Sequence, residues 1–109
     1  MTVLQEECAV GNVVVRYKLW PDRVEENERL VKAVYEQLRQ EKPEGVHYAT
    51  VKLPDGLTFM HLVFDVETTS RELNKLDAFK AFSAEVASRC EEPPNPMQLT
   101  VIGSYDLIP

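Results

Sequence analysis

Two histidines, His47 and His61, are the residues of this sequence best suited to proton transfer near neutral pH. An unperturbed imidazole has a pKa of about 6.5 and can exchange a proton with a phenol or an enol. Arg16 is always positively charged and could stabilise the anion that forms. The catalytic candidates are therefore His61, His47 and Arg16. Their ordinary alternatives are sheet histidines with satisfied hydrogen bonds and an arginine paired with a carboxylate across a dimer.

Aromatic residues at predicted strand positions are candidates for binding a flat ligand. A ring supplies a large apolar surface, and a phenol or an indole adds a hydrogen-bonding group. The ligand-binding candidates are Trp20, Tyr17, Tyr48 and Tyr105, together with Phe79 from a predicted helix. Core packing is the favoured alternative for Tyr17, whereas both interpretations stay open for Trp20 and Tyr105.

The segment 45–66 carries both histidines and reads as two strands joined by a tight turn. The turn sequence Leu-Pro-Asp-Gly-Leu (residues 53–57) predicts a three-residue loop with a glycine bulge. In that register His47 and His61 lie on the same face of the sheet. A two-residue loop of Asp55 and Gly56 would place them on opposite faces.

Asp65 shares the histidine face in the three-residue register, and two histidines with one carboxylate form a ligand set for non-haem iron. The residues match no metal-binding spacing, however, so we expect no metal and no cofactor. The sequence also lacks a phosphate-binding glycine loop, a nucleophile elbow, a Cys-x-x-Cys pair and a His-Glu-x-x-His helix. Hydrolase, kinase and zinc-enzyme functions lose their main support.

The remaining elements follow from hydrophobic spacing and helix caps. A β-branched strand is predicted at 13–20, and an Asp22–Glu25 capping box begins a helix that ends near 42–43. A second capping box, Thr69 with Glu72, begins another helix, which Asp77 could divide into two short ones.

The predicted second helix has an apolar stripe that extends as far as Cys90. Beyond it, the proline-rich residues 91–96 predict an extended loop, and residues 97–108 predict the last strand. The order is therefore β-α-β-β-α-β.

That order predicts a ferredoxin-like α+β fold, with a four-stranded antiparallel sheet of order 4-1-3-2 and two helices on one face. The strand 57–66 is apolar on both faces, which requires cover on both sides of the sheet. We expect a second copy of the sheet on the open face, with Met60 and Phe64 in the interface of a homodimer that buries about 2,000 Å² or more.

The chain has 109 residues, which fits one domain over 1–109, with 1–11 as an arm or an extra edge strand. A net charge of −6 and few basic residues argue against nucleic acid as a partner. No apolar run is long enough to span a membrane, and the first residues do not resemble a signal peptide, so we expect a cytoplasmic protein. Cys8 and Cys90 are expected to be reduced thiols.

The run FDVETTSRELNKLDAFKAFSAEVA (residues 64–87) resembles the dimeric α/β barrel superfamily and, within it, the antibiotic biosynthesis monooxygenase-like domains. The resemblance covers about residues 13–105 and is most specific at the segment 79–82, Phe-Lys-Ala-Phe. It implies a pocket between sheet and helices in each subunit. Some members oxidise polycyclic phenols with O2 and no cofactor, and others degrade haem. The haem-degrading members carry an asparagine near Val15 or Arg16 and a histidine where this chain has Asp77-Ala78, so haem degradation is not expected.

The expected function is therefore a homodimer that binds a small apolar or aromatic molecule and resembles cofactor-independent monooxygenases. The alternative is a non-catalytic ligand-binding or scaffold protein of the same fold. Small-molecule isomerisation, which would use a histidine with an arginine and consume no oxygen, is a third possibility.

Overall fold

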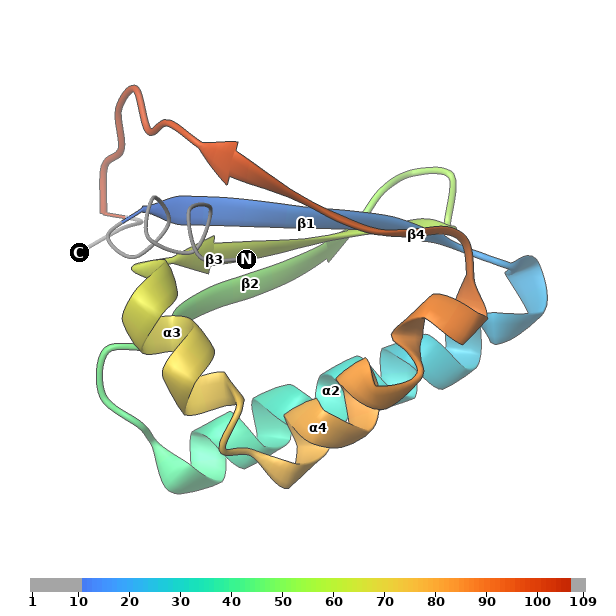
Figure 1. Ribbon diagram of the computed structural model, residues 1–109, viewed down its shortest axis with the longest axis horizontal. Coiled ribbons are helices and arrows are strands. Elements are labelled where there is room, and N and C mark those ends of the chain that lie inside the picture. Colours follow the sequence, from blue (N-terminus) through green and yellow to red (C-terminus); the bar gives the residue numbers. More distant parts are fainter. Residues whose placement is uncertain (1–10, 107–109) are drawn as a thin grey trace.

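A computed structural model describes residues 11–106 of the chain, and the predicted arm before residue 11 lies almost wholly outside them. The elements follow the predicted β-α-β-β-α-β order (Figure 1). They are β1 (Asn12–Leu19), the short 3-10 helix η1 (Pro21–Arg23), α2 (Val24–Glu41), β2 (His47–Lys52), β3 (Thr58–Phe64), α3 (Val66–Leu73), α4 (Asp77–Ala84), the 3-10 helix η2 (Val86–Arg89) and β4 (Cys90–Leu99).

The strands form one antiparallel sheet in the order β2-β3-β1-β4, which is the predicted order 4-1-3-2 read from the other edge. The helices α2, α3 and α4 all lie against the same face of this sheet (Figure 1). The ferredoxin-like α+β fold is thus confirmed. Among the described residues, no helix combines the length and the apolar character needed to cross a bilayer.

The core fills the space between the sheet and the helices. Strand residues on the helix side of the sheet meet the apolar stripes of α2 and α4. The buried cluster comprises Tyr17, Leu19, Val31, Val34, Phe59, Leu73, Leu76, Phe82 and Cys90.

The β2–β3 turn differs by one residue from the predicted three-residue loop. The Leu53 amide donates to the Thr58 carbonyl at 2.8 Å, so the four residues 54–57 lie in the loop. Asp55 explains the extra residue, because its carboxylate accepts hydrogen bonds from the amides of Leu57 and Thr58 and from the Thr58 hydroxyl. Gly56 has the predicted positive φ, at 75°.

This correction changes which side chains share a face. His47 pairs with Phe64 and Thr50 pairs with His61. Partners on neighbouring strands share a face and faces alternate along a strand, so His47 and His61 lie on opposite faces. This is the register of the two-residue alternative.

Both predicted capping boxes are wrong. Asp22 lies within η1, and neither η1 nor α2 has a side-chain cap. Thr69 lies inside α3, where its hydroxyl donates to the Phe64 carbonyl at 2.6 Å and accepts from the His47 amide at 3.1 Å. Its local pattern resembles a cap, but it ties α3 to the sheet instead.

The helix ends are closer to the predictions. α2 ends where Lys42 takes a left-handed φ of 49°, immediately before Pro43. The second helical region is divided as the Asp77 alternative predicts, with α3 ending at Leu73 and α4 beginning at Asp77.

The C-terminal prediction is wrong for residues 90–96 and 100–106, and right for the strand at 97–99. The proline-rich stretch belongs to β4, which begins at Cys90 and ends at Leu99, and the described residues after it form no strand. Prolines are tolerated because β4 is an edge strand of the sheet formed by residues 11–106 and pairs there with β1 alone, so a missing N–H need not interrupt a second ladder. Cys90 is consequently a buried strand residue and not part of a helix.

Candidate functional site

His61 lies on the helix side of β3, with only 4% of its surface exposed. Its Nε2 atom is 2.7 Å from the Tyr17 hydroxyl of β1. Its Nδ1 atom is 2.6 Å from the Tyr48 hydroxyl and 3.1 Å from the Thr50 hydroxyl, both on β2. The one-residue shift in the turn makes this possible, because it brings Thr50 directly opposite His61.

Side chains from outside the sheet extend the hydrogen bonds of His61 in two directions, beyond Tyr17 and beyond Thr50. Asn27 of α2 donates from Nδ2 to the Tyr17 hydroxyl at 2.9 Å. Arg89, the last residue of η2, donates from Nε to the Asn27 Oδ1 atom at 3.1 Å. At the other end the Tyr35 and Thr50 hydroxyls are 2.7 Å apart. We call the whole set, Arg89, Asn27, Tyr17, His61, Tyr48, Thr50 and Tyr35, the buried network.

Burial keeps His61 and the three tyrosines of the buried network in their neutral forms. It lowers the pKa of His61 to about 4, so the imidazole is uncharged at pH 7. Burial also raises the pKa of Tyr17 and Tyr48, and it raises that of Tyr35 to about 12. The site therefore holds a neutral imidazole among protonated phenols.

Arg89 is the charged member of the buried network, and only 1% of its surface is exposed. Its Nη2 atom donates to the Phe82 carbonyl at 2.8 Å, and its guanidinium carbon lies 5.4 Å from the centre of the Phe82 ring. Within residues 11–106 it forms no ion pair with a carboxylate. Burying this cation is costly, because an amide, a carbonyl and an aromatic ring must replace the water around it.

A pocket of about 320 Å³ lies between α2 and the edge strand β2, at the Thr50–Tyr35 end of the buried network. Its lining combines apolar and aromatic side chains with a charged rim formed by Lys32 and the Lys52–Glu28 ion pair. The lining residues are Glu28, Val31, Lys32, Tyr35, Thr50, Val51, Lys52 and Phe59. A small ring in this pocket would lie beside the hydroxyls that contact His61.

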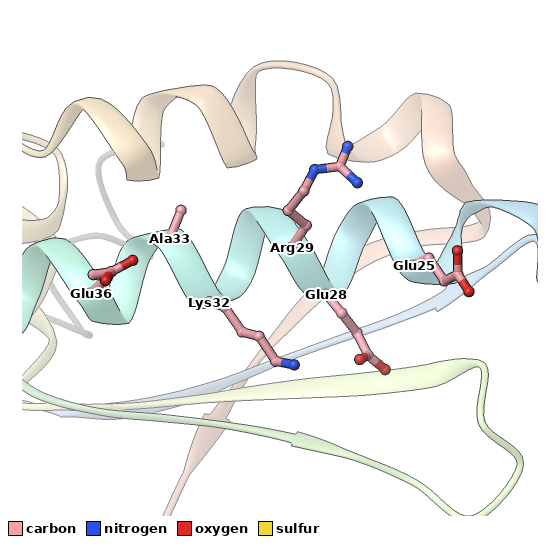
Figure 2. Close-up of a pocket in the computed structure, with 6 residues that line it drawn as sticks. All are labelled: Glu25, Glu28, Arg29, Lys32, Ala33 and Glu36. Atoms are coloured by element: carbon pink, nitrogen blue, oxygen red, sulfur yellow. The ribbon is translucent and has the colours of Figure 1, made fainter.

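A larger hollow, of about 460 Å³, follows the surface of α2 (Figure 2). All six of its lining residues come from that one helix, and most carry a charge. One helix supplies no facing wall, and none of the lining residues belongs to the buried network. We assign the candidate site to the smaller pocket for that reason.

His47 and Arg16 are not brought together with His61. Both are on the face of the sheet that points away from the helices, as their partners Phe64 and Met60 show. The Arg16 guanidinium donates to the Glu92 carboxylate at 2.9 Å. In the described part of the chain, no three His, Cys, Asp or Glu residues are grouped so as to hold a metal ion. The shared face for His47, His61 and Asp65 in the three-residue register does not occur.

The aromatic candidates divide into two groups. Tyr17 and Tyr48 belong to the buried network, and Phe79 packs against Phe82 with ring centres 6.1 Å apart. Trp20 lies just after β1 and is 47% exposed, and Tyr105 lies beyond β4 and is 95% exposed. Neither of the last two lines the pocket, and the strand position predicted for Tyr105 is wrong.

Four members of the buried network, Asn27, Tyr35, Thr50 and Arg89, were missed from the sequence. Asn27 had a visible signal, because it lies four residues before Val31 and is a polar residue on the buried face of α2. Thr50 became a neighbour of His61 only through the corrected register. Arg89 had no usable signal, because the predicted helix placed Cys90 on the apolar stripe and left its neighbour outside it.

Solved structures of other proteins share the fold of this chain. Rv0793 from Mycobacterium tuberculosis superposes with a TM-score of 0.68 and 17% identity, covering 85% of this chain and 95% of that one. A provisionally named antibiotic biosynthesis monooxygenase from Caulobacter crescentus gives 0.67 and 16%, covering 93% and 99%. A similarly named protein from Nitrosomonas europaea gives 0.67 and 13%, covering 84% and 88%.

This chain shares the fold of these solved structures. The predicted resemblance is thereby confirmed at the level of fold, and identities this low carry no further. No protein-family model matches the chain, and no curated protein matches it either. The similarity to these structures concerns the fold, and the buried network is formed by the side chains of this chain.

Proposed function

We propose that the protein binds a small apolar or aromatic molecule in the pocket between α2 and β2 and promotes its oxidation by O2 without a cofactor. The observation that carries this proposal is the contact between the pocket and His61. Thr50 lines the pocket and also lies 3.1 Å from the His61 ring, which is neutral and buried. Several proteins of the same fold are named as monooxygenases, which agrees with the proposal.

The chemistry requires an anionic form of the substrate, an enolate or a phenolate, because such an anion can give electrons to O2 directly. In the overall reaction a ring CH2 group and O2 become a ring carbonyl and water. The substrate supplies all the electrons, so no external reductant is needed. The protein contributes positioned hydroxyl groups that can donate hydrogen bonds to the anion.

We also propose that the protein is a homodimer. The sheet face away from the helices carries Ala49, Val51, Met60, Leu62, Phe64 and Met97. Val51 is 43% exposed and Met97 is 39% exposed, so much of this face is apolar and in contact with solvent. A second copy of the same face would cover it in a two-fold arrangement.

The test is oxygen consumption by the purified protein with an anthrone, which carries the ring CH2 group that the reaction needs, in the presence of a metal chelator. The His61→Asn variant is expected to lose most of the activity, because it removes the central ring of the buried network. His47→Asn is the matched control, since it changes the other histidine on the opposite sheet face. Equal activity of the His61→Asn variant and the unchanged protein would refute the proposal.

A non-catalytic ligand-binding protein is the second candidate function. It is favoured by the fact that both ring nitrogens of His61 already contact protein hydroxyls. Stoichiometric binding of the same molecules without oxygen consumption, measured by calorimetry, would support this alternative.

A further inference from the structure

The hydrogen bonds of the buried network run in one donor-to-acceptor order, which Arg89 sets. A guanidinium has only hydrogen-bond donors, so the Asn27 atom facing Arg89 must be the carbonyl oxygen Oδ1. The amide nitrogen Nδ2 of Asn27 therefore faces Tyr17 and donates to its hydroxyl oxygen. This fixes the orientation of an amide whose two ends would otherwise be interchangeable.

The same donor-to-acceptor order continues from Tyr17 to His61. Among the described residues, the Tyr17 hydroxyl has two polar partners, Asn27 and His61. Since it accepts from Asn27, its own proton is free to be donated to the His61 Nε2 atom. The neutral imidazole then carries its proton on Nδ1, which donates toward Tyr48 and Thr50.

The opposite direction is less favourable. If the His61 proton were on Nε2, the Tyr17 oxygen would accept from both His61 and Asn27, and its own proton would have no acceptor. Tyr17 is fully buried, and an unpaired buried hydroxyl costs about 1–3 kcal/mol. In the first arrangement the spare protons lie on Tyr48, which is partly exposed, and at the pocket wall.

At the pocket wall one hydroxyl proton remains free to be donated. Thr50 accepts from His61, and the hydrogen bond between Thr50 and Tyr35 uses one of their two hydroxyl protons. One O–H is left on the wall whichever of the two is the donor. Tyr35 stays protonated because its pKa is raised to about 12.

We infer that the pocket binds a ligand through a hydrogen-bond-accepting oxygen, such as an enolate, a phenolate or a ring carbonyl. Arg89 and Asn27 act as positioning residues that set the donor-to-acceptor order from Asn27 through Tyr17 to His61. His61 then serves as a donor relay to the ligand oxygen and does not remove its proton. At the pocket rim Lys52 is paired with Glu28, so Lys32 is the ammonium group that agrees with an anionic ligand. This inference rests on the proposed function, because it assumes that the ligand occupies this pocket.

The first test reads the tautomer of His61 by NMR in the 15N-labelled protein without ligand. The unchanged protein is expected to carry the His61 proton on Nδ1. The variant Asn27→Asp keeps the shape of the side chain but can only accept from Arg89 and Tyr17. Tyr17 would then donate to Asp, accept from His61, and move the imidazole proton to Nε2.

The His47→Gln variant assigns the signals, because it leaves His61 as the one histidine of the sequence. A proton on Nε2 in the unchanged protein would overturn the inference, as would the same tautomer in both proteins. This readout requires neither ligand nor turnover, so it is independent of whether the protein oxidises anything. A residue with a purely structural role would not exchange the tautomer.

The second test uses a nitrophenol whose phenolate absorbs visible light. Bound to the unchanged protein, the probe is expected to ionise at a lower pH than it does free in solution. The double variant Thr50→Val/Tyr35→Phe is expected to weaken phenolate binding about tenfold, because it removes the hydrogen bond to a charged oxygen, which either hydroxyl alone could still donate. Preferential binding of the neutral phenol, or no binding, would overturn the inference. Phenolate binding without oxygen consumption would support it and refute the proposed oxidation.

Discussion

The Nε2 atom of His61 lies 2.7 Å from the hydroxyl oxygen of Tyr17, and both side chains are buried between the sheet and α2. This contact joins β3 to β1 and places a titratable ring in the core. Because burial disfavours the charged imidazole, the contact ties the proposed site to the stability of the fold.

The pH dependence of stability should reflect His61. Its pKa is lowered to about 4 in the folded protein, compared with about 6.5 in an unfolded chain. Below the pKa of the unfolded state, the unfolded chain binds a proton that the folded protein does not. The contribution of His61 to stability is therefore complete above that pKa and is lost as the pH decreases below it. Urea unfolding is expected to show a loss of roughly 2 kcal/mol between about pH 7.5 and about pH 5.

The control for this loss is the pair of single-histidine variants. The free energy of unfolding of His61→Gln should depend much less on pH over the same window, whereas His47→Gln should keep the loss. A window that begins only at lower pH would instead indicate the carboxylates whose pKa is lowered, such as Glu26 and Glu28.

Removing the Tyr17 hydroxyl should destabilise the protein more than removing that of Tyr48. Tyr17→Phe leaves the Asn27 amide and the His61 Nε2 atom without their partner inside the core, at a cost of about 1–3 kcal/mol. Tyr48→Phe leaves Thr50 to pair with Nδ1 and should cost less. Denaturant unfolding of the two variants checks the order, and a larger loss for Tyr48→Phe would contradict it.

A charge on the open face of the sheet should separate the proposed dimer. Leu62→Lys places an ammonium in the middle of the apolar face on β3, where a partner sheet would bury it. Ala81→Lys adds the same group at an exposed position of α4 and should change nothing. Sedimentation of micromolar protein is expected to show a dimer for the unchanged chain and a monomer for Leu62→Lys. A well-behaved monomer of the unchanged chain would refute the dimer.

Reversing a charge at the pocket rim should weaken the binding of an anionic ligand. Lys32→Glu changes a rim residue, and an exposed charge interaction of up to about 1 kcal/mol corresponds to a two- to fivefold change in affinity. Lys80→Glu makes the same change in net charge at an exposed position of α4, outside the pocket lining. Fluorescence titration with a naphtholate probe measures both, and equal effects would show that only net charge matters.

Hydrophobic spacing in the sequence determined the order of the elements, the strand order and the placement of the helices on one face. These features depend on alternation along strands and on helical periodicity, which local residue types set. Residue type pointed to His61 together with His47, because an unperturbed imidazole exchanges a proton near neutral pH. The division of the second helical region at Asp77 could likewise be predicted, because aspartate favours a helix start.

Only the tertiary structure decided which residues surround His61. The Asp55 carboxylate added one residue to the turn, which brought Thr50 opposite His61 and sent His47 to the other face. Asn27 and Arg89 come from segments 62 residues apart and meet because α2 and η2 pack against the same sheet. Hydrogen bonds between such distant segments depend on packing in three dimensions, which no local pattern of residues records.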